Sequence, residues 1–244
     1  MISSEFSRSN SLNNIPKKKV QYKISDMISK CQECSTKNVE SDLLCKKCSM
    51  KSVAYKRFAE SNIPIEYWDL NMEKDFVGYQ GLKDKYDQVV SDIKKSYCNG
   101  QSFCFAGSHG VGKTTTVTSI LKSANLKGYT SLYTTLSDIV TVLTSASSSE
   151  KYDAKRELVM VDFLVIDEVD NRFVATENAA DLYARTLEVI FRTRSQNKLP
   201  TFVCTNSPNI VESFNGALKA SMDSLFNGYM EFVPVLGDDF RKRA

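Results

Sequence analysis

The most informative stretch of this chain is Gly107-Ser-His-Gly-Val-Gly112-Lys113-Thr114. It matches the pattern G-x-x-x-x-G-K-[ST] without a mismatch. A short apolar run, Ser102–Ala106, precedes it, and apolar residues at helical spacing follow it. The glycines let the backbone curl until successive N–H groups face an anion, and the start of the next helix adds its positive dipole end. The sequence therefore predicts a phosphate-binding loop between a strand and a helix.

The residues of this loop have separate predicted tasks. The ammonium group of Lys113 is expected on the β- and γ-phosphates of a nucleotide, and the Thr114 hydroxyl is expected to ligate Mg²⁺. His109 is the only histidine of the chain, and we expect it to lie on the turn without a catalytic role. The residues predicted to contact the nucleotide are Gly107, Ser108, His109, Gly110, Val111, Gly112, Lys113, Thr114 and Thr115.

An apolar run that ends in two acids, Leu164-Val-Ile-Asp167-Glu168, follows some 50 residues later. A carboxylate at the carboxyl end of a parallel strand lies beside a phosphate loop. Asp167 is therefore predicted to hold the Mg²⁺ shell, and Glu168 to polarise the attacking water. The nearby Asp170 is expected to face solvent.

Two weaker signals come from the last quarter of the chain. Asn206 follows the apolar run 201–204, where a polar side chain could reach between the γ-phosphate and the water. An Asn after a strand more often starts a turn. Arg241, in Gly237-Asp-Asp-Phe-Arg241, could place a guanidinium on the phosphates, although it could also be an ordinary member of a basic tail.

From about residue 82 onward, short apolar strands alternate with amphipathic helices. Strands are expected at 102–106, 129–134, 163–166, 201–204 and 230–233. Helices are expected at 82–97, 117–124, 136–143 and 178–195, and a polar, Ser-rich loop at 145–152. This alternation predicts an α/β fold with a five-stranded parallel sheet covered on both faces.

Four of the seven cysteines form two C-x₂-C pairs separated by ten residues, at Cys31, Cys34, Cys45 and Cys48. Four thiolates would make a closed, structural zinc site, and the metal would supply folding free energy to a segment too small for its own core. The alternative is four unligated surface cysteines. The remaining three, Cys98, Cys104 and Cys204, are expected in the core.

Composition narrows the function classes. With 42% hydrophobic and 25% charged residues the chain can bury a core, which excludes wholesale disorder. No apolar run approaches the roughly 20 residues of a membrane span, so no membrane partner is expected. The N-terminus lacks an apolar signal core, so we expect a reducing, cytoplasmic location. A net charge of +3 permits contact with nucleic acid without demanding it.

The chain divides into four expected segments: a flexible basic tail at 1–25, a zinc-binding module at 26–60, a connector at 61–81 and an ATPase domain at 82–244. Lys17, Lys18 and Lys19 in the tail could also touch DNA phosphates.

Several features together resemble those of AAA+ ATPases, and more narrowly those of the DnaC/DnaI-type helicase loaders of bacteria and phages. They are the phosphate loop, the acids that end the run 164–168, the two weaker C-terminal signals, the cysteine pairs and the connector sequence Asn62-Ile-Pro-Ile-Glu-Tyr-Trp. The resemblance covers roughly residues 26–244. It implies that 107–114 is the Walker A motif, that Asp167 and Glu168 form Walker B, and that Asn206 and Arg241 are sensors 1 and 2. It also implies the sheet order 5-1-4-3-2. Because the chain ends three residues after Arg241, no C-terminal helical lid is expected.

The same resemblance implies ATP and Mg²⁺ as cofactors, self-assembly with ATP, and contact with single-stranded DNA. The zinc region would grip the hexameric replicative helicase, so the expected function is ATP-dependent helicase loading in replication. Two alternatives stay open: a transposition-helper ATPase acting on double-stranded DNA, and an ATP-binding adaptor with little hydrolysis.

One position departs from the family pattern. Ser224 stands where the family usually carries an arginine finger. Lys219, Arg192 or Arg194 could replace it. Because such an arginine stabilises transition-state charge, its absence predicts slow hydrolysis.

Overall fold

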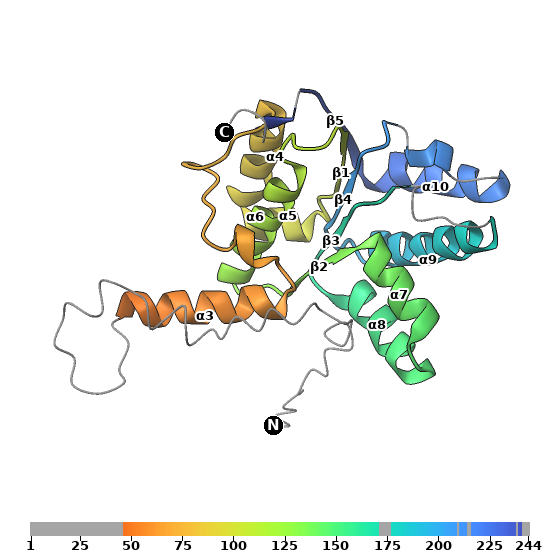
Figure 1. The fold of residues 1–244 in the computed structure, drawn as a ribbon, viewed down its shortest axis with the longest axis horizontal. Helices are drawn as coiled ribbons and strands as arrows, with labels where there is room; N and C mark the ends of the chain where they lie inside the picture. The colour runs from red at the N-terminus through yellow and green to blue at the C-terminus, as the bar shows by residue number, and fades with distance from the viewer. Residues whose placement is uncertain (1–45, 171–176, 209, 214–215, 238, 241–244) are drawn as a thin grey trace.

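The computed structural model describes residues 46–170, 177–208, 210–213, 216–237 and 239–240. A single five-stranded sheet lies at its centre, with helices on both faces (Figure 1). The strands are β1 (Phe103–Gly107), β2 (Ser131–Thr135), β3 (Phe163–Asp167), β4 (Thr201–Thr205) and β5 (Glu231–Val235). All neighbouring pairs are parallel, and the order is β2-β3-β4-β1-β5. This is the predicted order 5-1-4-3-2 read from the other edge, so the predicted fold is confirmed.

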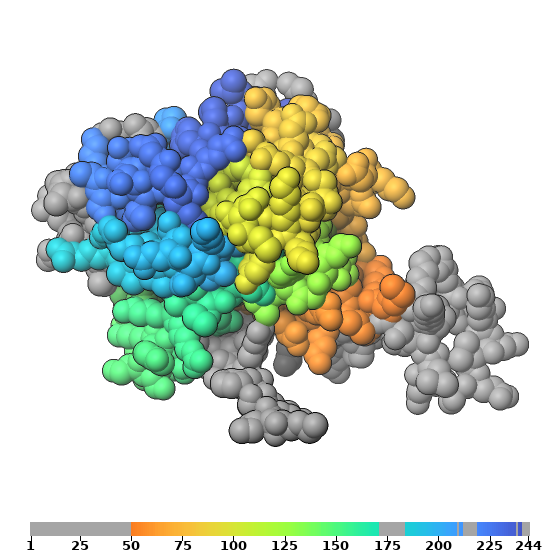
Figure 2. All heavy atoms as spheres, turned by 180° about the vertical axis from the view of Figure 1, so that it is seen from behind, coloured from red at the N-terminus to blue at the C-terminus, as the bar shows by residue number. Residues whose placement is uncertain are grey.

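The two faces of the sheet carry different helices (Figure 1). One face holds α3 (Lys46–Glu60), η2 (Ile65–Tyr67), α4 (Gln80–Val90), α5 (Ile93–Cys98) and α6 (Lys113–Leu126). The other holds α7 (Leu136–Ser145), α8 (Ser148–Met160), α9 (Glu177–Gln196), η4 (Ile210–Ser213) and α10 (Gly216–Tyr229). On this second face, α9 and α10 pack side by side, as Figure 2 also shows.

The middle strands are buried on both sides. Every residue of β3 and β4 is buried, which matches the continuous apolar runs of strands inside a helix-covered parallel sheet. Alternate residues of β3 enter different cores: Leu164 and Ile166 pack with α7–α10, whereas Phe163 and Val165 pack with α4–α6. This rigid centre holds the carboxyl ends of β1, β3 and β4 in one row.

The loop predicted at 145–152 is wrong, because α8 begins inside it at Ser148. Ser147 accepts from the backbone N–H of Glu150, whose carboxylate accepts in return from the N–H of Ser147. This reciprocal capping box satisfies backbone donors at the helix start. Only Ala154 and Leu158 of α8 are buried, so the apolar stripe is narrow and its period is hard to read.

Two smaller expectations also fail. The single helix predicted at 82–97 is broken into α4 and α5, because the Asp92 carboxylate accepts from the N–H of Lys95 and starts a new helix. Cys104 and Cys204 are buried as predicted, whereas Cys98 is exposed at the end of α5.

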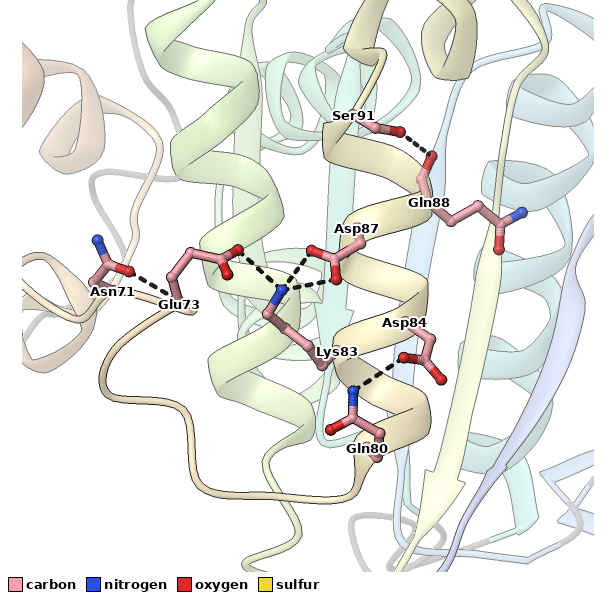
Figure 3. A network of polar contacts seen from close by, with 8 residues as sticks. All are labelled: Asn71, Glu73, Gln80, Lys83, Asp84, Asp87, Gln88 and Ser91. Atoms are coloured by element: carbon pink, nitrogen blue, oxygen red, sulfur yellow. Dashed lines mark hydrogen bonds and ion pairs between the residues drawn. The ribbon is translucent and has the colours of Figure 1, made fainter.

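The segment before β1 is fastened to the body of the fold. Tyr55 and Phe58 of α3 are buried and pack with the ring of Trp68. The Nζ atom of Lys122 donates to the Tyr67 carbonyl at 2.6 Å. In Figure 3, the Nζ atom of Lys83 donates to two acids, Glu73 of the connector at 2.9 Å and Asp87 of α4 at 2.6 Å. Residues 50–60, assigned to the cysteine module from sequence, thus pack against the α/β body.

Across the described residues, none of the helices is both long enough and apolar enough to cross a bilayer.

Candidate nucleotide-binding site

The loop between β1 and α6 has a backbone that requires glycine. Gly110 has φ of +73° and Gly112 has φ of +100°, both in the left-handed region that side chains disfavour. A Cβ at Gly110 would lie 1.7 Å from an Asp239 carboxylate oxygen, and a Cβ at Gly112 would lie 2.9 Å from the Phe76 ring. The curled loop therefore depends on these two glycines for conformation and for space.

Lys113 is the first residue of α6 and is buried at the mouth of the loop. Its Nζ atom donates to the carbonyl oxygens of Gly107 and Ser108, at 2.7 Å each, and to Oδ1 of Asn206 at 3.0 Å. The ammonium group therefore already lies between the phosphate loop and the end of β4, where a β- or γ-phosphate oxygen could replace a carbonyl as its acceptor.

Asp167, the last residue of β3, faces the same opening. Its Oδ2 atom accepts from the Thr114 hydroxyl at 2.8 Å, and its Oδ1 atom accepts from the N–H of Glu168 at 2.7 Å. A hydroxyl and a carboxylate oxygen this close suit Mg²⁺, which prefers hard oxygen ligands. Thr114 and Asp167 would hold that ion, and the ion would supply positive charge against the phosphates of a bound nucleotide.

Tyr133 of β2 also touches Asp167, and sequence reasoning missed it. Its hydroxyl donates to Asp167 Oδ2 at 3.0 Å. Burial and the neighbouring carboxylate both raise the pKa of Tyr133, so the phenol stays a proton donor at neutral pH. The contact depends on β2 lying beside β3, with Thr135 opposite Asp167, which no local pattern reveals.

Glu168 follows Asp167 with φ of +54°, a left-handed conformation that is rare for a residue with a side chain. Its side chain is exposed at the carboxyl edge of the sheet, next to the acid that would hold the metal. A carboxylate in this place suits the predicted task of polarising a water, which remains a prediction.

The expectation that Asp170 faces solvent is wrong. Asp170 is buried, and its carboxylate accepts from the backbone N–H of Asn206 at 2.8 Å and from the Asn206 amide at 2.7 Å. It also accepts from the Thr205 hydroxyl at 3.2 Å. Asn206 is therefore held between this acid and Lys113.

Two further segments lie against the phosphate loop. The N–H of Tyr79 donates to the Val111 carbonyl at 3.2 Å, and the N–H of Phe240 donates to the Gly110 carbonyl at 3.1 Å. The hydroxyl of Ser108 donates to the Gly237 carbonyl at 3.0 Å. These contacts join points more than 30 residues apart in the chain, so the sequence offered no signal for them.

The structure brings together Lys113, Thr114, Asp167, Glu168 and Asn206. His109 and Ser108 are exposed on the loop. Arg241 lies outside the described residues, as do Cys31, Cys34 and Cys45, and Cys48 falls near the start of α3 in a stretch whose side chains are not described. In the part of the chain that is described, no three His, Cys, Asp or Glu side chains converge on a metal position.

Arg194, one of the three residues considered as a replacement for an arginine finger, cannot reach a neighbouring subunit, which corrects that expectation. Its guanidinium is fully buried and donates to the carbonyl oxygens of Val161 and Pro200, at 2.8 Å each. Arg192 is exposed and pairs with Glu188 at 2.8 Å.

The sheet order, the curled loop after β1 and the acid at the end of β3 define a class of protein, the P-loop nucleoside triphosphatases. The model of the ATPase family associated with various cellular activities (AAA) matches residues 103–226, just over half of the chain. The chain belongs to this family.

Among curated proteins, the chain is similar to the replicative helicase loader DnaC of Escherichia coli K12, with 27% identity over 192 residues, 78% of this chain and 76% of that protein. Among solved structures, it resembles DnaI, with TM-score 0.58 and 16% identity over 72% of this chain and 93% of that one. It also resembles the replication initiator DnaA bound to AMPPCP and single-stranded DNA, with TM-score 0.57 and 17% identity over 72% of this chain. That match spans about half of the DnaA chain, 51%.

Proposed function

We propose that this protein is an ATP-dependent loader of a hexameric replicative DNA helicase, acting in the initiation of DNA replication. The observation that carries the proposal is the 27% identity to DnaC over 78% of the chain, a stretch that includes more than the family model covers. The related DnaA structure, with a nucleotide analogue and single-stranded DNA bound, adds support for single-stranded DNA as a second partner.

In this proposal the protein binds ATP through the loop 107–115, with Lys113 moving from the loop carbonyls to the phosphates. Thr114 and Asp167 hold Mg²⁺, Glu168 polarises the attacking water, and Asn206 serves as sensor 1 beside Lys113. Arg241 would add a positive charge from the C-terminal segment. ATP binding orders the loader's assembly and its grip on DNA, and hydrolysis releases the helicase.

We further propose that hydrolysis is slow. Ser224, where the family usually has an arginine finger, is exposed on α10. Arg194 is occupied within the core, which leaves Arg192 and Lys219 as the described candidates from the sequence. Without a well-placed arginine from a neighbouring subunit, transition-state charge is poorly offset. Turnover that rises steeply with protein concentration would contradict this part of the proposal.

The cysteine module at 26–60 is proposed to bind one structural Zn²⁺ and to grip the helicase. The support is the cysteine spacing alone. Zinc content measured by atomic absorption tests it: the full chain should carry one equivalent, and Cys34→Ser should lose it. Cys98→Ser removes an exposed thiol elsewhere and is the matched control. Stoichiometric zinc in Cys34→Ser would overturn the assignment.

The function is tested by the native mass of the chain mixed with the replicative helicase of its own host, with and without ATP. A defined complex is expected, and it should be lost when residues 1–45 are removed. In the presence of ATP, Glu168→Gln should keep the complex and stop its turnover. If no complex forms in any nucleotide state, helicase loading is wrong. Binding to a transposase with double-stranded DNA would then favour the transposition helper, and nucleotide binding with no turnover would favour the adaptor.

A further inference from the structure

Asp170 is a buried carboxylate that the reaction outlined above does not use. Its exposed fraction is 7%, and it lies three residues after Asp167. The chain reaches this point by a tight turn: Glu168 adopts φ of +54°, and the N–H of Asp170 donates back to the Glu168 carbonyl at 2.9 Å. Between them, the N–H of Val169 donates to the Cys204 carbonyl at 3.0 Å, which continues the pairing of β3 with β4.

This turn directs the Asp170 carboxylate at the end of β4. One oxygen, Oδ1, accepts from the backbone N–H of Asn206 at 2.8 Å, and the other, Oδ2, accepts from the Asn206 Nδ2 atom at 2.7 Å. A carboxylate only accepts hydrogen bonds, so the nitrogen end of the Asn206 amide must face it. The oxygen end of the same amide then faces Lys113, whose Nζ atom lies 3.0 Å away.

We propose that Asp170 is a positioning residue that fixes the Asn206 amide with its oxygen toward Lys113. The inference deepens the proposed function, because it concerns the same ATP site. In this arrangement Asn206 presents an acceptor to the reaction centre. It steadies the Lys113 ammonium, or accepts from the attacking water, instead of donating to the γ-phosphate. Asp170 acts only through Asn206 and does not itself touch the nucleotide.

The inference predicts what isosteric changes do. In Asp170→Asn, the new amide would still accept from the Asn206 N–H and would turn its NH₂ group toward the Asn206 side chain. That side chain would have to reverse, which would bring its own NH₂ group against the Lys113 ammonium. The reversal removes one charge-assisted hydrogen bond at the reacting end of Lys113, which corresponds to a loss of about tenfold or more in rate.

A swap of the two groups separates positioning from other roles. In the double variant Asp170→Asn with Asn206→Asp, an amide at position 170 donates to a carboxylate at position 206, whose second oxygen again faces Lys113. The swap restores the acceptor and is expected to recover most of the activity. If Asn206 had to donate to the γ-phosphate, the swap would be as inactive as either single change.

The experiment measures kcat for ATP hydrolysis, and dissociation constants for Mg²⁺–ATP and Mg²⁺–ADP, on the full-length chain below its unfolding temperature. Asp170→Asn should lower kcat about tenfold while the affinity for ADP stays within about threefold, and the swap should restore kcat. Asp162→Asn is the matched control, because Asp162 accepts from Thr130 at the other end of β3. It should lower stability and leave kcat unchanged.

The outcomes also separate this inference from the function on which it rests. If the wild type binds ATP without hydrolysing it, the enzymatic part of the proposed function fails. The positioning role is then decided by the ratio of ATP to ADP affinity, which Asp170→Asn should lower about fivefold and the swap should restore. Wild-type kcat and ratio in Asp170→Asn, or a swap that does not recover, would overturn the inference. A wild type that binds neither nucleotide would overturn both.

Discussion

Three hydrogen-bond donors hold the Asp167 carboxylate in place. Thr114, Tyr133 and the Glu168 N–H all donate to its two oxygens. The Thr114 hydroxyl can keep donating its proton to Asp167 while its oxygen lone pairs face a bound Mg²⁺ ion. Tyr133 is the side-chain donor that fixes Asp167 from outside the phosphate loop, since it reaches the acid from β2.

Tyr133→Phe should therefore weaken Mg²⁺ binding. The change removes the hydroxyl and keeps the ring, so the fold should persist while the Asp167 carboxylate loses one fixed donor. The Mg²⁺ concentration needed for half-maximal ATP binding should rise about tenfold, the lower end of the effect of losing an outer-shell partner. Titration of ATP binding with Mg²⁺ measures it. Tyr129→Phe, just before β2, is the control and should show no shift; an unchanged Mg²⁺ requirement in Tyr133→Phe would contradict the prediction.

At the scale of the helices, two buried cations tie elements together, and neither was singled out from the sequence as structural. The Lys122 ammonium on α6 donates to the carbonyl oxygen of Tyr67 at 2.6 Å and to that of Leu70 at 2.5 Å, fastening the connector. The Arg194 guanidinium on α9 donates to the Leu158 carbonyl near the end of α8 and to the Pro200 carbonyl just before β4. The hydrogen bonds to these carbonyl oxygens recover part of the desolvation cost of each buried cation.

Lys122 makes stability depend on pH. Burial lowers its pKa to about 8 from 10.5, against the opposing attraction of Asp69 and Asp75. Because the unfolded chain holds this proton up to about pH 10.5, it binds more protons than the folded chain between about pH 8 and 10.5. The free energy of unfolding contributed by this group therefore rises with pH across that window.

The prediction is that the urea midpoint of the wild type rises, relative to that of Lys122→Met, between about pH 7.5 and 9.5. The upper limit stays below the range in which tyrosines ionise. Lys127→Met, at an exposed position after α6, is the matched control and should track the wild type at every pH. A wild-type midpoint that falls relative to Lys122→Met over this interval would show that the sign is wrong.

Arg194 should be sensitive even to a substitution that keeps its positive charge. Arg194→Lys cannot reproduce a planar group that donates in several directions, so carbonyls at the end of α8 and the start of β4 lose their partner. The expected loss is about 3 kcal/mol of unfolding free energy, because buried carbonyl oxygens lose their donors, and denaturant titration measures it. Arg192→Lys, at an exposed, paired site two residues earlier, should cost less than about 1 kcal/mol. Equal stabilities of the two variants would contradict the structural role assigned to Arg194.

At the scale of the whole molecule, some features could be predicted from the sequence. They are the ones that follow from the order of strands and helices along the chain and from the shared direction of the strands. Asp167 and Asn206 could be placed beside the phosphate loop because both follow apolar runs, and the carboxyl ends of parallel strands share an edge. The layers could be predicted for the same reason: strands and helices alternate, and the connections are short.

Features that depend on approach between distant segments could not be predicted. From the sequence, Asp170 is expected to be a solvated acid. It is buried because Glu168 adopts a left-handed backbone conformation that turns the chain toward β4. Helix α8 was missed because its Ser-rich start resembles a loop and only two of its side chains are buried, although the Ser147–Glu150 spacing of a capping box was present. Tyr133 needed the register of β2 against β3.

We expect the carboxyl edge of this sheet to be an ATP site built on Lys113 and Asp167. Its most direct test is the dissociation constant of Mg²⁺–ATP by equilibrium dialysis, for the wild type and for Lys113→Ala, with Lys127→Ala as the exposed control. The wild type and Lys127→Ala should bind ATP alike, and Lys113→Ala should bind at least about tenfold more weakly, because a buried ammonium between the loop and β4 is lost. Equal affinity in all three chains, or no affinity in the wild type, would contradict the account.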